Sequence, residues 1–284
     1  MQSWKIGDVR VTKLQEQQPV WAGTMITANA TADNIKREGE WLSPFVDNNG
    51  QILLSIHALL VESEGRKIIV DTCVGNDKPR PGFKDFNQLH LPFLADLEKA
   101  GASREAIDTV VCTHLHLDHV GWNTMLEGGR WVPTFPKARY MMCQREWDHW
   151  SKYDGMLDFK LPIDDSVRPV IEAGLADLVE PNRRLTGEVW LEPTPGHTPG
   201  HMSVRISSGG ENAVITGDLI HHPIQVAHPE WICEFDTDPK MAGETRQKFV
   251  ERYCDQPVRV LGTHFAGPTA GHIVRRSGSF HFEP

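Results

Sequence analysis

The sequence contains no long hydrophobic run, and its first ten residues lack the apolar stretch of a signal peptide. A membrane-spanning helix needs about 20 mostly apolar residues, so we expect neither a membrane anchor nor an export signal. Cysteine is sparse as well: the chain has five, an odd number, and none of them forms a C-x-x-C pair. This usage predicts reduced, mostly buried thiols and a cytoplasmic location.

Positive charge is also in short supply. The chain has 29 Lys plus Arg against 38 Asp plus Glu, which gives a net charge of −9. General attraction to nucleic acid or to anionic lipid is therefore not expected. No short repeat or low-complexity tract is present, and 284 residues can bury a sizeable core. We predict one domain over residues 1–284, in which residues 15–50 form an irregular segment near the active site.

Histidine is concentrated in one stretch, Thr113 to Trp122, where three imidazoles and one carboxylate fall within residues 114–119. On an extended backbone the alternation would place His114, His116 and Asp118 on one side. Imidazole nitrogen and carboxylate oxygen are typical ligands of zinc and similar divalent ions. A histidine-rich surface loop is the alternative. The apolar run at residues 109–112 favours a metal site at the end of a buried strand.

Three later strand ends offer further ligands. His197 lies in a turn rich in glycine and proline, Asp218 follows an apolar strand at residues 213–216, and His264 follows another at residues 258–261. Each of these taken alone is more typical of ordinary turn chemistry. In combination with the first motif, they predict a shared metal centre.

The pattern of strands and helices indicates sheets covered by helices. We predict strands at residues 4–14, 51–62, 67–71, 109–112, 139–142, 188–191, 201–206, 213–216 and 258–261. We predict helices at residues 92–101, 144–153, 166–180 and 238–253.

The H-x-H-x-D-H motif with the separate Gly-His, Gly-Asp and Thr-His elements resembles the metallo-β-lactamase superfamily over nearly the whole chain. The resemblance implies an α/β fold, the αββα sandwich of two mixed sheets flanked by helices, with metals held at one edge between the sheets. It also implies the ligands: His114, His116 and His197 for one metal, Asp118, His119 and His264 for the second, and Asp218 as the bridge. Asp71 matches a buried aspartate that orients a ligand histidine.

Within the superfamily, Gly121-Trp122 and the run from Gly217 to His222 are most similar to the lactonase and methyl parathion hydrolase branch. The resemblance implies two divalent ions, most simply zinc, and a bridging hydroxide that cleaves a small lactone or ester, including an aryl ester or organophosphate. Asp118 would be both ligand and proton carrier. The chain departs from many lactonases because no tyrosine lies between His197 and Asp218.

Substrate contacts are predicted at Trp122, His222 and Phe265. Two metal ions, two ligand carboxylates and one hydroxide would give the core a charge of about +1, which suits a neutral or weakly anionic small molecule. A homodimer stays open, since residues 15–50 could cover their own pocket or a partner's. Two other functions also remain open: a thioester hydrolase resembling glyoxalase II, and a mononuclear iron protein that oxidises sulfur or only binds metal.

Overall fold

A computed structural model describes all residues from Met1 to Pro284. Its first β-sheet has seven strands in the order β1-β2-β5-β6-β7-β10-β11. Neighbours from β1 to β6 are antiparallel, whereas β6, β7, β10 and β11 run parallel to one another. The bounds are β1 (Ser3–Ile6), β2 (Val9–Gln17), β5 (Ile56–Ser63), β6 (Arg66–Val70), β7 (Thr109–Val111), β10 (Arg139–Cys143) and β11 (Ala176–Val179).

The second sheet follows the chain order from β12 to β17. Only β14 and β15 pair in parallel, and all other neighbours are antiparallel. The bounds are β12 (Val189–Pro193), β13 (Met202–Ser208), β14 (Glu211–Ile215), β15 (Val258–Leu261), β16 (Ala270–Arg276) and β17 (Ser279–Glu283).

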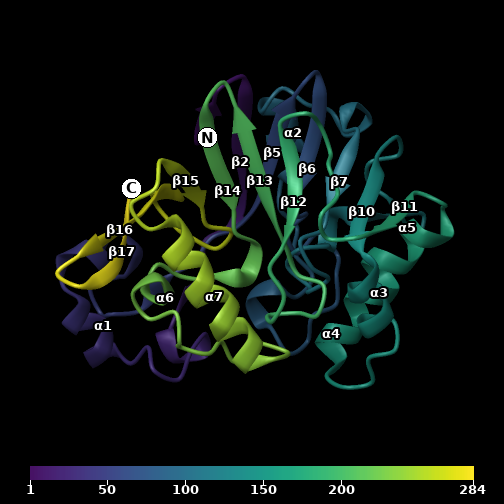
Figure 1. Cartoon of the computed structure of the whole chain (residues 1–284). Helices are drawn as coiled ribbons and strands as arrows, with labels where there is room; N and C mark the ends of the chain where they lie inside the picture. Colours follow the sequence, from purple (N-terminus) through teal and green to yellow (C-terminus); the bar gives the residue numbers. More distant parts are fainter.

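Three hydrophobic clusters define the layers, because alternate strand residues face opposite sides of a sheet. On β5, Leu59 and Val61 pack between the sheets against Val204 and Ile206 of β13. The intervening Leu60 joins the cluster on the outer face of the first sheet. That face is covered by α2 (Phe93–Lys99), α3 (Gln144–Trp150), α4 (Leu157–Pro162) and α5 (Arg168–Glu172), and the other outer face by α1 (Ala32–Glu38), α6 (Ile224–Ala227) and α7 (Pro239–Tyr253) (Figure 1). The predicted αββα sandwich is confirmed.

Short elements complete the chain. They are the two-stranded pairs β3 (Val20–Trp21) with β4 (Ile52–Leu53) and β8 (Thr124–Glu127) with β9 (Arg130–Pro133), the 3-10 turns η1 (Gly23–Met25), η2 (Glu40–Phe45), η3 (Lys84–Phe86), η4 (Arg104–Ala106), η5 (Gly121–Asn123) and η7 (Gly217–Leu219), and the π-helical η6 (Ile163–Val167).

The predicted helix at residues 166–180 is wrong in its second half. Helical structure ends at Glu172, Gly174 adopts a φ of 70°, and β11 then pairs in parallel with β10. Glycine enters this left-handed conformation readily, and it reverses the chain where the helical pattern would otherwise continue. The strands β16 and β17 and the helix α1 were not predicted.

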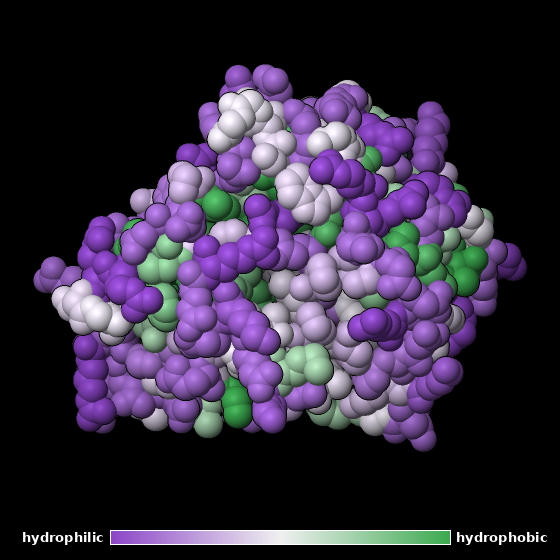
Figure 2. Space-filling model, in the orientation of Figure 1, coloured by the Kyte–Doolittle hydropathy of each residue, from purple (hydrophilic) through white to green (hydrophobic).

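The surface is mainly hydrophilic on the face drawn in Figure 2, and the hydrophobic side chains there form small separate groups. No helix combines the length and the apolar character that crossing a membrane requires. All five cysteines are free, and only Cys254 is not buried, as the sequence predicted.

Candidate metal centre

The strand ends of both sheets meet at one site. In the first sheet, β6 leads into Asp71 and β7 leads into residues 114–119. In the second, His197 follows β12, Asp218 lies in the turn after β14, and His264 follows β15. Polar side chains from chain segments far apart in sequence therefore converge at one edge between the sheets.

The backbone of the histidine motif is not extended. β7 ends at Val111, and residues 113–120 form turns in which the His119 amide donates to the His116 carbonyl, 3.1 Å away. The predicted alternation on one side of a strand is therefore wrong, because the turn sends His116 and Asp118 into different groups. Gly121 permits this path: a Cβ there would lie 1.8 Å from the Val74 carbonyl oxygen.

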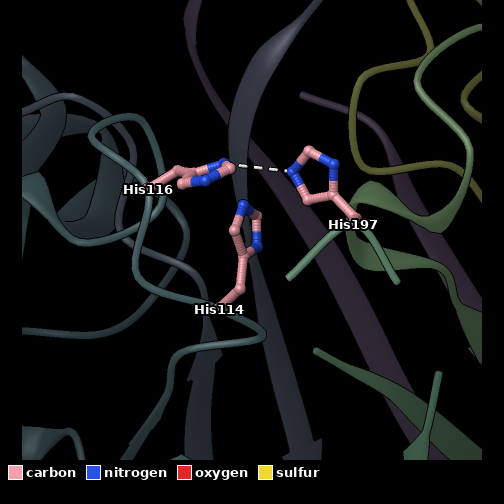
Figure 3. Close-up of side chains that lie close together, drawn as sticks. All are labelled: His114, His116 and His197. Carbon is pink, nitrogen blue, oxygen red and sulfur yellow. Dashed lines mark hydrogen bonds between the residues drawn. The ribbon is translucent and has the colours of Figure 1, made fainter. Parts of the chain in front are cut away.

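The first group is His114, His116 and His197, whose ligand nitrogens lie within 4.8 Å of one another (Figure 3). His116 Nδ1 and His197 Nε2 are 3.0 Å apart. Burial lowers the pKa of all three imidazoles, so the neutral rings present lone pairs. The buried Nε2 atoms of His114 and His116 have no hydrogen-bond partner. Unpaired buried acceptors are costly, and a divalent cation fits this donor set.

The second group is Asp118, His119 and His264. His119 Nε2 lies 3.6 Å from Asp118 Oδ1, and His264 Nε2 lies 3.6 Å from Asp118 Oδ2. Asp118 is the most exposed of the three, with 17% of its side chain accessible. A carboxylate and two imidazoles again form a set of ligands suited to zinc.

Asp218 lies between the two groups. Its Oδ2 is 3.8 Å from His114 Nε2, 3.6 Å from His197 Nε2 and 3.2 Å from His119 Nε2, and its Oδ1 is 3.1 Å from His264 Nε2. Four of the six residues named for the two metal sites, two from each group, therefore surround one carboxylate. This arrangement suits a bridging ligand.

The charges around Asp218 oppose the effect of burial. Burial alone would raise the pKa of Asp218, but the surrounding imidazoles, led by His119 and His264, hold it well below its usual value. Burial would lower the pKa of His119, yet Asp218, Asp118 and Asp71 raise it well above the usual value. The buried carboxylates thus require a compensating positive charge, which imidazolium or a bound cation can supply.

The second nitrogen of four ligand rings is held by an oxygen. His119 Nδ1 lies 3.0 Å from Asp71 Oδ2, and His197 Nδ1 lies 3.0 Å from Asp236 Oδ1. The corresponding partners are the Thr113 hydroxyl for His114 and the Ser55 carbonyl for His264. Such contacts fix the orientation and tautomer of a ligating imidazole. Asp71 lies where the sequence predicted; Asp236 was missed, because no local motif marks it.

Glu146 of α3 connects the two ligand-bearing turns. Its carboxylate accepts hydrogen bonds from the backbone amide of Leu115 at 3.2 Å and from that of Gly200 at 2.7 Å, and also from the Trp150 indole. Glu146 is fully buried, and burial raises its pKa. No sequence motif marks this residue, since its contacts join segments that are far apart in the chain.

A largely apolar pocket opens over the candidate metal ligands. Five aromatic residues line it, and no lysine or arginine does. Phe159 packs 4.9 Å from His116 between ring centroids, and Phe83, Phe86 and Trp21 continue the wall. The lining residues are Trp21, Ile26, Leu54, Phe83, Phe86, His116, Leu117, Asp118, Phe159, His197, Asp218, His221, Phe235 and His264.

The three predicted substrate contacts lie outside this pocket. The Trp122 indole donates to Glu16 and stacks on Phe93. His222 Nε2 lies 2.9 Å from the Phe45 carbonyl oxygen. Phe265 packs in the same hydrophobic cluster as the Phe45 side chain. All three are buried and support the frame of the site rather than its surface.

His221, which directly precedes His222, does line the pocket. Its Nε2 lies 3.3 Å from Asp218 Oδ2. The sequence shows the pair His221-His222 but not which ring turns inward. The hydrogen bond from the His221 amide to Gln225 Oε1, 2.8 Å long, helps to determine that the His221 ring faces the pocket.

Comparison with known proteins identifies the class. Residues 52–273 match the metallo-beta-lactamase superfamily. The match spans most of the chain, and the chain belongs to this superfamily. The resemblance predicted from the motifs is confirmed.

Curated relatives match over part of their length. YobT of Bacillus subtilis (strain 168), an uncharacterised protein, is 29% identical over 181 residues, 58% of this chain and 62% of its own. A probable metallo-hydrolase of Mycobacterium tuberculosis (strain ATCC 25618 / H37Rv), Rv2300c, is 28% identical over 191 residues, 60% of this chain and 58% of its own. The chain thus aligns with about three fifths of these relatives.

Solved structures share the fold over nearly all of the chain. The dizinc quorum-quenching lactonase AidC has a TM-score of 0.79 at 24% identity, covering 100% of this chain and 96% of its own. The hydrolase AbOPH has a TM-score of 0.81 at 24% identity, covering 99% and 96%. At these identities the likeness establishes the fold alone.

Proposed function

We propose that the chain is a dinuclear metal-dependent hydrolase that cleaves a small lactone or ester, with aryl esters and organophosphates included in this class. The observation that carries the proposal is the pair of ligand groups on either side of Asp218, at the base of an apolar pocket. His114, His116 and His197 would hold one ion, and Asp118, His119 and His264 the other. We infer zinc from the mixture of imidazole and carboxylate donors.

When bound, two such ions supply a hydroxide nucleophile at neutral pH and polarise the carbonyl or phosphoryl oxygen under attack. The chain's own residues supply the rest. Asp118 lines the pocket and is partly exposed, so its carboxylate can accept a proton and pass it to a leaving group. Asp71 and Asp236 keep His119 and His197 in place during the reaction.

The pocket lining supports a neutral or weakly anionic substrate with an apolar part. Phe83, Phe159 and Phe235 line the pocket beside His116 and His197, and apolar contact of this kind favours an acyl chain or an aryl group. AidC is described as a lactonase in complex with the product N-hexanoyl-L-homoserine, and AbOPH as a hydrolase. Those descriptions are consistent with the proposed class.

The two alternatives fit the site less well. A thioester hydrolase for an anionic thiol carrier needs cationic side chains, and none lines the pocket. A mononuclear iron protein would leave the second group of ligands, centred on His119, without an ion. Both alternatives remain outcomes of the test.

The test combines a metal count with a substrate panel. Purified protein, reconstituted with zinc and freed of excess metal, is assayed against a lactone, an aryl ester, a phosphotriester and a thioester. We expect two zinc ions per chain and hydrolysis of at least one of the first three substrates. One metal per chain without hydrolysis of any substrate would refute the proposal, and exclusive thioester hydrolysis would favour the glyoxalase II-like alternative.

A further inference from the structure

A third group of metal-ligand atoms lies beside the first and includes sulfur. The ligand atoms of His197, His221 and Cys233 lie within 4.8 Å of one another, and all three residues are buried. Cys233 Sγ is 3.7 Å from His221 Nε2. Neither His221 nor Cys233 has a place among the six ligands and the bridge described above. Two imidazoles and a thiol form a softer donor set, which favours thiophilic ions.

The surrounding structure holds these donors in place. Asp236 binds two of them at once: its Oδ1 contacts His197 Nδ1, and its Oδ2 accepts from the Cys233 amide at 2.9 Å. The Phe235 amide donates to Cys233 Sγ at 3.5 Å. A contact of this kind fixes the position of the sulfur beside the two imidazoles. Arg246, fully buried, contacts the same Asp236 carboxylate at 3.4 Å.

His197 belongs to both the first group and this third one. Its Nδ1 is occupied by Asp236, so Nε2 is the only nitrogen left for a metal. The same Nε2 lies 3.0 Å from His116 Nδ1, in the first group. One ring nitrogen cannot serve as a full ligand to two separate ions.

We propose that His197, His221 and Cys233 form a sulfur-containing metal position that takes a thiophilic divalent ion and competes with the first metal site for His197. Occupation of this position removes His197 from the first site and releases the ion held there. The competition rests on the proposed dinuclear site, whereas the sulfur-containing position is additional to it.

The test titrates zinc-loaded protein with Cd²⁺. Thiolate-to-cadmium charge transfer gives an ultraviolet absorption band, and released zinc is counted with a colorimetric chelator. We expect wild-type protein to develop the band with about one equivalent of Cd²⁺ and to release about one zinc ion per chain. Cys233→Ser should lose the band, whereas Cys254→Ser, which changes the one cysteine that is not buried, should keep it.

Each other result would overturn the inference. A missing band in wild-type protein excludes the sulfur ligand without any variant, so a folding defect in Cys233→Ser cannot obscure the answer. A band that survives in Cys233→Ser, or disappears in Cys254→Ser, assigns the ion to another thiol. A band without zinc release refutes the competition for His197. Hydrolysis is not measured, so failure of the proposed hydrolase activity is detected separately by the substrate panel.

Discussion

Asp71 and Asp236 each hold one histidine of the two candidate ligand groups, His119 and His197 respectively. Asp71 also accepts from the Thr113 amide at 2.8 Å, so it fixes the start of the histidine motif together with His119. Its φ of 57° lies in the left-handed region, which asparagine and aspartate tolerate better than most residues. An Asn substitution therefore removes the charge at Asp71 without new backbone strain.

Exchanging each aspartate for asparagine should weaken one metal site selectively. We expect Asp236→Asn to lower the affinity of the site that contains His197, and Asp71→Asn to lower that of the site that contains His119, each by ~10–100-fold. Competition titration with a chromogenic chelator measures both affinities, and each variant is the control for the other. Equal weakening of both sites in both variants would contradict separate orienting roles.

Lys13 of β2 is buried without a carboxylate partner. Its side-chain nitrogen donates to the Thr269 hydroxyl at 2.7 Å, and only 4% of the residue is exposed. Burial lowers the pKa of Lys13 to about 8 from 10.5. Between pH 8 and pH 10.5, Lys13 is protonated more fully in the unfolded chain than in the folded one. This lysine therefore makes the free energy of unfolding rise with pH.

Lys13→Met should abolish the increase of the free energy of unfolding with pH that Lys13 causes. Between pH 7.5 and 9.5, the free energy of unfolding of wild-type protein should increase by about 2 kcal/mol relative to Lys13→Met. Urea unfolding at both pH values measures the difference, and replacing the exposed Lys5 of β1 with Met should leave the behaviour of the wild type unchanged. A constant difference between wild type and Lys13→Met would show that Lys13 does not titrate in this range.

At the scale of elements, polar contacts to Asp165 and Asp158 connect the segments that form the pocket wall. Arg80 forms a bidentate pair with Asp165 of η6 at 2.7 and 3.0 Å, and Lys78 Nζ lies 3.7 Å from the same carboxylate. The Gly82 amide donates to Asp158 of α4. The loop that carries Phe83 is thereby attached to the helix that carries Phe159.

Removing the charge of Asp165 should be strongly destabilising, because the buried Arg80 guanidinium then lacks its carboxylate partner. We expect Asp165→Asn to lower the free energy of unfolding by about 3–5 kcal/mol. The neighbouring Asp164 is exposed and pairs only with Arg168. Asp164→Asn should therefore change the free energy of unfolding by less than about 0.5 kcal/mol. Denaturant unfolding of the two variants measures both changes in the free energy of unfolding. Similar small effects would mean that the contacts of Asp165 with Arg80 and Lys78 are not needed for stability.

The elements that the sequence predicted well are those with a strong local pattern. The hairpin of β5 and β6, the strand β15 and the helix α7 agree with their apolar runs and turn residues. The segment at residues 176–179 was mistaken for helix because four residues are too few to show a period. Its strand conformation comes from parallel pairing with β10, a contact that no local pattern contains.

At the scale of the whole molecule, the two sheets divide the candidate metal ligands between them. The turns after the first sheet carry His114, His116, Asp118 and His119, and those after the second carry His197, Asp218 and His264. The motifs were readable because strand ends with adjacent glycine are local features. The resemblance pointed to Asp71, but not to Asp236 or Glu146. The contacts of these two residues, and the ring of His221-His222 that faces the pocket, depend on how distant segments pack.

The central claim is that these seven residues hold two ions with Asp218 between them. A crystal structure of zinc-loaded protein, with anomalous scattering recorded at the zinc edge, tests it most directly. We predict two anomalous peaks, one among His114, His116 and His197 and one among Asp118, His119 and His264, both in contact with Asp218. A single peak, or two peaks of which either lies away from Asp218, would contradict the account.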